Sequence, residues 1–328
     1  MAMAPVVGDS AMAALDGALR DAFPAVDFRM AYGSGVFAQK DHDTSTSMID
    51  LVFAVEDPRA WHAVNIERNP SHYSFLRCFG ADNVASFQET YGAGVYYNTL
   101  VPLQCPTLGN RLIKYGVVRS DTLCQDLRDW RTLYLSGRMH KPVSIMASTE
   151  TIDAAASQNL QHALDYALLC LPEKFDERDL YMRIAGISYL GDFRMTFGEN
   201  PKKVRNIVEG NMVAFQQLYR NKLVTSPLLQ RQNDGSILSG AHDASSQRVL
   251  LGRLPSNVAR KLPDGFQTTT HSQKDVKKHV QRAVASIVNR YSRSQSIKGI
   301  LTAGAAKSIT YVAQKLGRTY FRAKSKAR

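Results

Sequence analysis

The sequence FRMAYGSGVF, residues 28–37, is followed ten residues later by MIDLVFAV, residues 48–55. The first stretch begins as a short strand and reaches a Gly-Ser-Gly turn at residues 33–35. The second is rich in β-branched and apolar residues, which predicts a buried strand, yet it carries the carboxylate of Asp50. A Gly-Ser turn is often simple punctuation, but it also allows a phosphate to approach backbone N–H groups closely.

The flanking segments extend this pattern into a small mixed sheet with helices on one side. Further strands are expected at residues 94–103 and 111–118. Helices are expected at residues 11–22, 58–68, 72–79 and 121–134. We therefore expect residues 1–150 to form an α+β domain.

The rest of the chain is mostly helical in pattern. Helices are expected at residues 157–171, 178–189, 202–219 and 273–291, with a loop or flexible wing at residues 230–246. We expect a mostly helical domain at residues 151–270 and a basic C-terminal region at residues 271–328.

The composition is that of a folded soluble protein, with 44% hydrophobic and 21% charged residues. No apolar run approaches the ~18–20 residues that cross a bilayer. The four cysteines form no CxxC pair, which argues against a disulfide framework or zinc site and fits a reducing compartment. The N-terminus lacks a secretory apolar region and is too acidic for an obvious transit peptide.

The positive charge is concentrated at the C-terminal end. The formal net charge is +12, and residues 251–328 contain 17 Lys and Arg against only Asp264 and Asp275. The preceding 250 residues are therefore slightly acidic. Such a tail implies an anionic partner, either nucleic acid or the surface of an acidic membrane.

The last segment has the pattern of an amphipathic helix. With ~100° between successive residues, its apolar and basic side chains fall on opposite faces. The apolar face comprises Ile309, Val312, Ala313, Leu316 and Tyr320, and the basic face comprises Lys307, Lys315, Arg318 and Arg322. We expect this helix to bind a membrane; a helix packed on the protein's own second domain is the alternative.

A strand that ends in Gly33 and Ser34, followed by a nearby strand with Asp50, is the minimal layout of a polymerase-β-type nucleotidyltransferase. In that layout the turn holds a triphosphate and the carboxylate holds Mg²⁺, which prefers oxygen ligands and substrate phosphates. A carboxylate in a buried strand needs a cation or hydrogen-bond donors. Lys114, inside an apolar strand, either snorkels to the surface or is aimed at an anion.

Other polar residues carry weaker indications. Arg138 and Lys141 in GRMHKP add two cations, although a turn after a helix is commonly a solvated cap. His72 is a candidate base, but a hydrogen-bonded structural histidine explains it as well. No Ser-His-Asp, Cys-His or His-cluster arrangement is evident, which disfavours hydrolytic and zinc chemistry.

Seven blocks, in order, resemble the mitochondrial phosphatidate cytidylyltransferases, the matrix-side CDP-diacylglycerol synthases also described as mitochondrial translocator assembly and maintenance proteins. The blocks are YGSGVFAQ, MIDLVFAVEDPRAWHAVNIERNPSHYSFL, YGAGVYYN, RLIKYGVV, DLRDWRTLYLSGRMHKPV, ISYLGDFRM and RSQSIKGILTAGAAKS. The resemblance spans roughly residues 28–308. It implies a nucleotidyltransferase domain, a winged-helix-like domain and a C-terminal membrane-binding helix.

The resemblance also implies substrates, a cofactor and a location. The substrates are CTP and phosphatidic acid, and the product is CDP-diacylglycerol for cardiolipin and phosphatidylglycerol synthesis, with Mg²⁺ as cofactor. The implied location is the matrix side of the mitochondrial inner membrane, as a peripheral protein held by anionic lipids. No nucleic-acid partner is expected.

Site residues follow from the matching positions. Those for the nucleotide are Gly33, Ser34, Gly35, Lys114, Tyr115, Arg138 and Lys141, and Asp50 is the metal ligand. Related nucleotidyltransferases often place two acids at alternate strand positions, but Met48 and Val52 stand there in this chain. Asp192, in a Gly-Asp turn, is the candidate second metal ligand and thereby a catalytic residue; a helix cap is the alternative.

Two other functions compete with this one. A nucleotidyltransferase acting on RNA would use the basic tail for nucleic acid, but the tail has a continuous apolar face. A non-enzymatic membrane-associated translocase assembly factor would leave Gly33, Ser34, Asp50 and Lys114 without a role.

Overall fold

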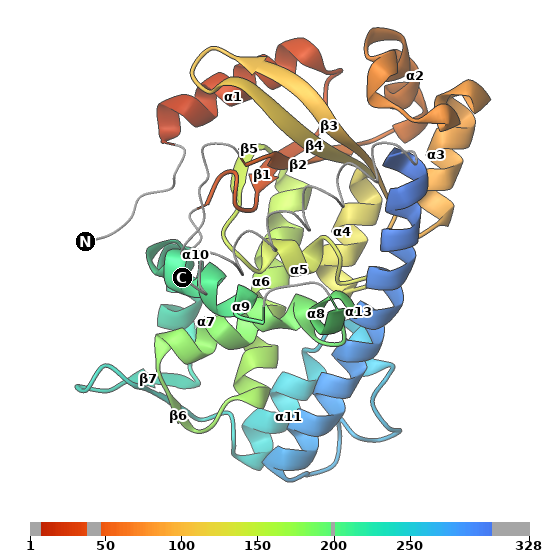
Figure 1. The fold of residues 1–328 in the computed structure, drawn as a ribbon. Helices are drawn as coiled ribbons and strands as arrows, with labels where there is room; N and C mark the ends of the chain where they lie inside the picture. The colour runs from red at the N-terminus through yellow and green to blue at the C-terminus, as the bar shows by residue number, and fades with distance from the viewer. Residues whose placement is uncertain (1–7, 38–46, 198–200, 304–328) are drawn as a thin grey trace, which may run out of the picture.

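The structure is a computed structural model that describes residues 8–37, 47–197 and 201–303. Its main sheet has five strands in the order β3-β4-β2-β1-β5 (Figure 1). The strands are β1 Phe28–Tyr32, β2 Ile49–Val55, β3 Val95–Cys105, β4 Gly109–Arg119 and β5 Ser144–Ala147. β2 and β4 are parallel, and the other neighbouring strands pair antiparallel. The mixed sheet predicted from the sequence is therefore present, with β5 as an additional edge strand.

Helices cover both faces of this sheet, not one as the sequence pattern had indicated. Because side chains alternate along a strand, each strand contributes to two cores. On one face, Leu15 of α1 (Asp9–Ala22) and Trp61 of α2 (Pro58–Arg68) pack in a core with Leu51. On the other face, Leu123 of α4 (Ser120–Asp129) packs in a core with Val52.

The segment between β2 and β3 differs from its prediction. Residues 72–79 were expected to be one helix, but they contain parts of two 3₁₀ turns, Pro70–His72 and Phe75–Phe79. They are followed by α3, Gly80–Thr90, which the pattern did not reveal. The turn between them requires Gly80, whose φ is +83°.

A second, mostly helical body follows the sheet. Its elements are α5 Ser136–Met139, α6 Glu150–Cys170, α7 Glu177–Gly186, the 3₁₀ turn η3 Ile187–Tyr189, α8 Arg194–Phe197, α9 Lys203–Gly210, α10 Met212–Thr225, α11 Ala244–Gly252 and α12 Ser256–Ala259. A small sheet, β6-β8-β7, joins β6 Lys174–Phe175, β8 Ile237–Ser239 and β7 Leu229–Arg231. The expected loop at 230–246 therefore contains most of a hairpin and the first turn of a helix.

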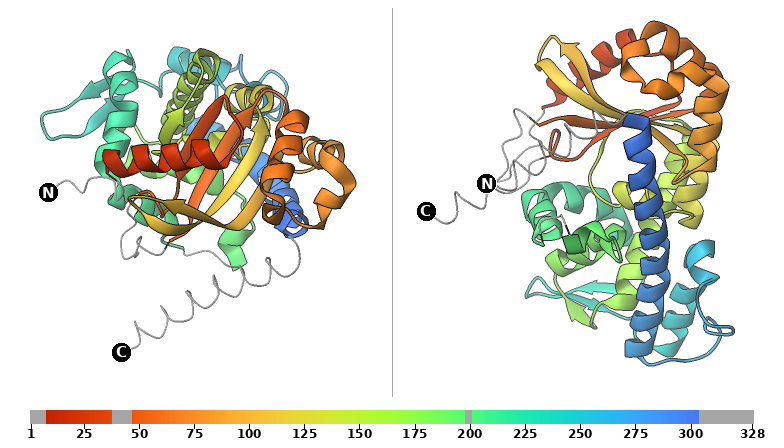
Figure 2. Two further views of the ribbon diagram at one scale, coloured as in Figure 1. Left: turned by 90° about the horizontal axis from the view of Figure 1, so that it is seen from above. Right: turned by 45° about the vertical axis from the view of Figure 1, so that its right-hand side comes forward.

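The long helix α13, Gln273–Ala303, runs beside both bodies (Figure 2, right). Its inner face is apolar, because Val276, Val280, Val284 and Ile287 are buried in the helical core. The helix continues beyond the predicted end at residue 291 and packs against β3. Residues 273–303 are thus an integral part of the fold.

The sheet and the helical body share helix α6. This helix begins in a core of the sheet, with Ile152, and ends in the helical core, with Leu169.

The predicted membrane-binding residues lie outside the described residues; they are Ile309, Val312, Lys315, Leu316, Arg318, Tyr320 and Arg322. Within the described residues, no helix combines the length and apolar character that a bilayer crossing needs.

Candidate active site

Three side chains form a row across the centre of the main sheet. Tyr32 of β1 pairs with Asp50 of β2, and Asp50 pairs with Lys114 of β4. Paired residues on neighbouring strands project their side chains to the same face of a sheet. This face is the one covered by α4 and α5, so the row faces the helical body.

Asp50 lies at the second position of β2 and is half-exposed, in contrast to the buried carboxylate expected from the sequence. The ammonium of Lys114 lies 3.9 Å from its Oδ1 atom. The same ammonium lies 4.6 Å from the ring centroid of Tyr97. Lys114 therefore points toward the carboxylate and an aromatic face of the site, and its role in binding an anionic ligand stays a prediction.

The glycine turn lies directly against this carboxylate. Gly33 has a φ of +81°, and a Cβ atom there would come within 3.1 Å of Asp50 Oδ2. A Cβ atom on Gly35 would lie 2.7 Å from the carbonyl oxygen of Met48. Both positions therefore require glycine, one for its backbone conformation and both for space. Ser34 lies half-buried in the same turn, between these two glycines.

Arg138 comes to the same face from α5. Its guanidinium lies 4.7 Å from the ring centroid of Tyr32 and 4.8 Å from that of Tyr134. The loop before α5 is fixed by Asp126, whose carboxylate accepts hydrogen bonds from backbone N–H groups of Thr132, Leu133, Leu135 and Ser136. The buried carboxylate of Asp126 thus holds the loop that positions Arg138.

Lys141 lies just beyond Arg138 in the chain. Its ammonium donates to the carbonyl oxygen of Gly137 and, at 2.9 Å, to the hydroxyl of Ser188. It also lies 5.3 Å from the ring centroid of Tyr189. Arg138 and Lys141 are thus positioned by tertiary contacts instead of forming a solvated cap.

The site is electropositive. Burial alone would raise the pKa of Tyr134, but the charges of Arg138, Lys114 and Arg194 outweigh it, and that pKa is lowered. Burial, together with the charges of Arg138 and Lys203, lowers the pKa of Lys141 to about 7. A lysine whose pKa is lowered by neighbouring cations gains a favourable partner when an anion binds beside it.

The contacts of Asp192 match its alternative interpretation as a helix cap. Its carboxylate is almost fully buried, and both oxygens accept hydrogen bonds from the Arg194 guanidinium. Oδ1 also accepts from the backbone N–H of Arg194 at the start of α8, as a capping residue does. A ligand role would require Arg194 to release the carboxylate, so that role stays a prediction.

Tyr115 lies away from the row, and its predicted place in the nucleotide site is wrong. Its neighbour Lys114 faces the site, so Tyr115 points to the opposite face, where it is fully buried. Its hydroxyl accepts hydrogen bonds from Asn65 and Asn98 and contacts His72 Nδ1 at 3.1 Å. His72 is thus a hydrogen-bonded structural residue, as one of its two interpretations held.

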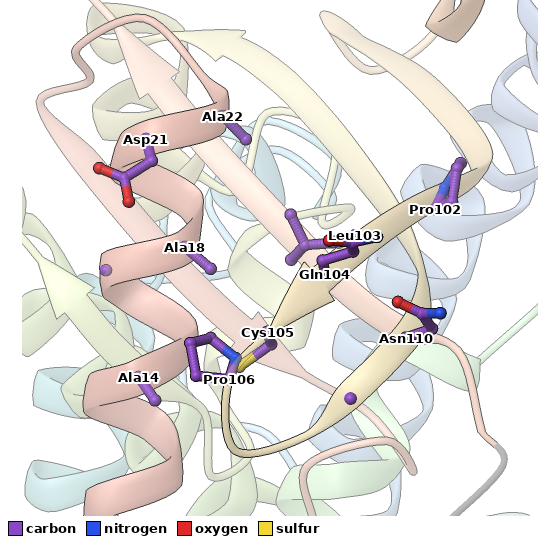
Figure 3. Close-up of a pocket in the computed structure, with 12 residues that line it drawn as sticks. Ala14, Ala18, Asp21, Ala22, Pro102, Leu103, Gln104, Cys105, Pro106 and Asn110 are labelled. Atoms are coloured by element: carbon purple, nitrogen blue, oxygen red, sulfur yellow. The ribbon is translucent and has the colours of Figure 1, made fainter.

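A groove of about 1000 Å³ lies on the opposite side of the sheet, between α1 and the β3–β4 hairpin (Figure 3). Its lining includes Ala18 and Asp21 of α1 and Gln104 and Asn110 of the hairpin. None of the predicted site residues borders it. The groove is therefore separate from the row of Tyr32, Asp50 and Lys114.

The side chains of the site supply only some of the ligands that a divalent cation needs. Among residues 8–37, 47–197 and 201–303, no three His, Cys, Asp or Glu side chains cluster as a metal site. Mg²⁺, however, is commonly bound through one or two carboxylates together with substrate phosphates. Asp50 suits that arrangement, because it is half-exposed and its neighbour Gly33 has no Cβ atom to block access to the carboxylate.

Comparison with known proteins identifies the family. The family model for mitochondrial phosphatidate cytidylyltransferase matches residues 16–318. The chain belongs to this family. A mitochondrial phosphatidate cytidylyltransferase from Xenopus laevis is 42% identical over 308 residues, covering 89% of this chain and 90% of the relative. Relatives of the same name from Danio rerio and Schizosaccharomyces pombe are 41% and 37% identical, covering 88% and 89% of this chain and 90% and 79% of their own.

Several site residues were missed in the sequence. Tyr32 and Tyr97 supply aromatic faces, and Tyr134, Tyr189 and Lys203 contribute from the segments around the helical body. Tyr32 could have been found, since it directly precedes the glycine turn. The others come from distant segments whose patterns indicate only core or surface.

Proposed function

We propose that this chain is a phosphatidate cytidylyltransferase that forms CDP-diacylglycerol and pyrophosphate from CTP and phosphatidic acid. The observation that carries the proposal is the contact of Asp50 with both Lys114 and the Gly33 turn, within a chain of this family. This is the local arrangement needed to receive a triphosphate: open backbone, a cation and a carboxylate.

In the reaction, a phosphate oxygen of phosphatidic acid attacks the α-phosphorus of CTP. The bond between the α-phosphorus and the bridging oxygen breaks, and pyrophosphate leaves with the electron pair. Because the attacking oxygen is already anionic, no strong general base is needed. This agrees with His72 being bound in the hydrogen-bond network of the opposite face.

The residues of the site divide the work. The turn of residues 33–35 and Lys114 bind and orient the triphosphate, and Arg138 stabilises negative charge that develops on the transferring group and on pyrophosphate. Asp50 would hold Mg²⁺ together with the triphosphate, and the ion would supply charge neutralisation. Asp192 would complete that site only after separating from Arg194.

The architecture and location are part of the same proposal. The main sheet with its glycine turn would be a polymerase-β-type nucleotidyltransferase domain, and the helical body with the β7–β8 hairpin a winged-helix-like domain. The relatives are named mitochondrial, and we place this chain on the matrix side of the inner membrane as a peripheral protein. Residues 305–328 would bind its anionic lipids.

The test is release of pyrophosphate from CTP with phosphatidic acid vesicles as acceptor, with CDP-diacylglycerol measured in parallel. Release that depends on phosphatidic acid and yields CDP-diacylglycerol supports the proposal. Nucleotide addition to RNA in place of lipid would indicate the RNA enzyme, and a folded protein with neither activity would indicate an assembly factor.

A further inference from the structure

A second group of cations lies among the helical elements, close to Arg138. The ammonium of Lys141 lies 5.3 Å from the ring centroid of Tyr189, and that of Lys203 lies 5.7 Å from the same centroid. Lys203 begins α9, and Tyr189 ends η3. Figure 1 shows α5, α8 and α9 in the middle of the molecule, below the main sheet.

This group is built into the fold. A Cβ atom on Gly137 would lie 2.6 Å from Ser188 Cβ, so α5 and η3 approach closely only because residue 137 is glycine. Lys141 bonds across the same junction to Gly137 and Ser188. Its ammonium is thereby held at the boundary between the sheet and the helical body, with Arg138 and Lys203 as charged neighbours.

Two like-charged substrates need two sets of cations. CTP carries a triphosphate, and phosphatidic acid carries a phosphate monoester, so they repel each other when they meet. Lys114, Asp50 and the glycine turn form one set on the sheet. Lys141 and Lys203, around Tyr189, form another on the helical elements, and Arg138, which lies over the Tyr32 ring of the sheet, is a charged neighbour of Lys141.

We infer that Lys141 and Lys203, on the ring of Tyr189, form the subsite for the phosphate monoester of the lipid substrate, separate from the triphosphate subsite at Lys114. This inference rests on the proposed function and deepens it. It reassigns Lys141, which the sequence grouped with the nucleotide, to the acceptor. The ring of Tyr189 offers both ammonium groups a cation–π contact when no phosphate is bound.

The test uses soluble dihexanoyl phosphatidic acid, so that membrane attachment does not affect the result. Lys203→Gln and Lys141→Gln are compared with Lys222→Gln, a matched control, because Lys222 is also a half-buried lysine bonded to a serine hydroxyl, that of Ser157. The KM for the lipid and the Kd of Mg-CTP by calorimetry are measured for each variant.

We expect Lys203→Gln and Lys141→Gln each to raise the KM for the lipid about tenfold, the size of one lost charge-assisted phosphate contact, with the Kd of Mg-CTP changed less than about twofold. Lys114→Gln should raise the Kd of Mg-CTP and leave the KM for the lipid nearly unchanged. Lys222→Gln should change neither the KM for the lipid nor the Kd of Mg-CTP. If Mg-CTP binding weakens as much as lipid use, the cations belong to the triphosphate. If neither parameter changes in Lys203→Gln, a folded variant, the inference is wrong.

A binding measurement without CTP separates this inference from the proposed function. Calorimetric titration of the protein with dihexanoyl phosphatidic acid needs no turnover. Binding that is lost in Lys203→Gln, in a protein that makes no CDP-diacylglycerol, would leave the subsite in place and overturn the proposed function. Turnover in the native protein with equal lipid binding by native protein and Lys203→Gln would overturn the subsite alone.

Discussion

The ammonium of Lys298 lies 2.6 Å from the carbonyl oxygen of Tyr91, 207 residues earlier in the chain. It also donates to the carbonyl oxygen of Gln88, at 2.7 Å, near the end of α3. One turn earlier on α13, Gln295 accepts from the N–H of Ala93 and donates to the carbonyl oxygen of Val95. These buried contacts fasten α13 to the sheet domain, and the same helix is part of the helical core. The helix therefore ties the sheet domain to the helical body.

Lys298→Met should destabilise the protein by about 1–3 kcal/mol, because two buried carbonyl oxygens lose their hydrogen-bond donor. Urea denaturation at pH 7 measures the loss. A control is Lys174→Met, which removes an exposed ion pair with Asp234 and should change stability by less than about 1 kcal/mol. Equal stability of Lys298→Met and the native protein would show that α13 is held by its apolar face alone.

The pH dependence of stability should also change in Lys298→Met. Burial lowers the pKa of Lys298 in the folded protein to about 7 from its ordinary 10.5. Between these values the unfolded chain binds more protons at this residue, so Lys298 adds stability as the pH rises from 7 toward 10. Urea denaturation at pH 7 and pH 9 should show a larger rise for the native protein than for Lys298→Met. Parallel curves would mean that the folded lysine keeps its ordinary pKa.

Gly92→Ala should be more destabilising than Gly109→Ala. The two residues have φ values of +67° and +64°, so both substitutions carry the cost of that backbone conformation, about 1–2 kcal/mol. Only at Gly92 would the new Cβ atom meet a neighbour, Gln295 Oε1 at 2.5 Å, whereas nothing lies within 4 Å at Gly109. The difference in melting temperature reports the close approach of α13, and no difference would show that Gln295 moves away freely.

Asp50→Asn should abolish CDP-diacylglycerol formation without unfolding the protein, because the side chain is half-exposed and keeps its shape. The neutral amide removes the carboxylate that would hold the metal ion. Turnover is measured across a range of Mg²⁺ concentrations, with circular dichroism to confirm folding. Substantial turnover by the folded variant at ordinary Mg²⁺ would exclude Asp50 as the metal ligand.

Lys114→Ala should weaken the use of CTP by roughly 10- to 200-fold, the loss expected for one charge-assisted phosphate contact of ~1.5–3 kcal/mol. Ser34→Ala should act in the same direction with a smaller effect, because a neutral hydroxyl makes a weaker bond. The Kd of Mg-CTP by calorimetry is the measurement. Unchanged CTP binding in Lys114→Ala would show that the lysine does not bind the triphosphate.

Removal of residues 305–328 should release the protein from vesicles that contain cardiolipin or phosphatidic acid, and Leu316→Asp should have the same effect. Each basic residue near an anionic surface contributes about 1 kcal/mol, and the apolar face adds to this. Flotation with anionic and with phosphatidylcholine vesicles is the measurement. Truncated protein that floats with anionic vesicles as well as the full chain does would place membrane binding elsewhere.

The local pattern of the sequence determined much of the sheet and its turn. Apolar and β-branched stretches predicted β1, β2, β3 and β4, because strands that pack against a core are rich in such residues. The glycines at 33 and 35 marked a place of close backbone approach, and Asp50 marked a polar end on an apolar strand. These are properties of neighbouring residues, so a single sequence displays them.

Only the tertiary structure determined which distant residues meet. The pairing of Asp50 with Lys114 depends on the parallel register of β2 and β4, and the same register turns Tyr115 to the opposite face. For Arg138 and Lys141 the sequence left a nucleotide site and a solvated cap as alternatives, and only the Asp126 loop and the Gly137–Ser188 contact show how the two side chains are positioned. For Asp192 the sequence left a metal ligand and a helix cap as alternatives, and only the structure shows that Arg194 binds both carboxylate oxygens. Such long-range contacts depend on how whole elements pack, and no local pattern records that packing.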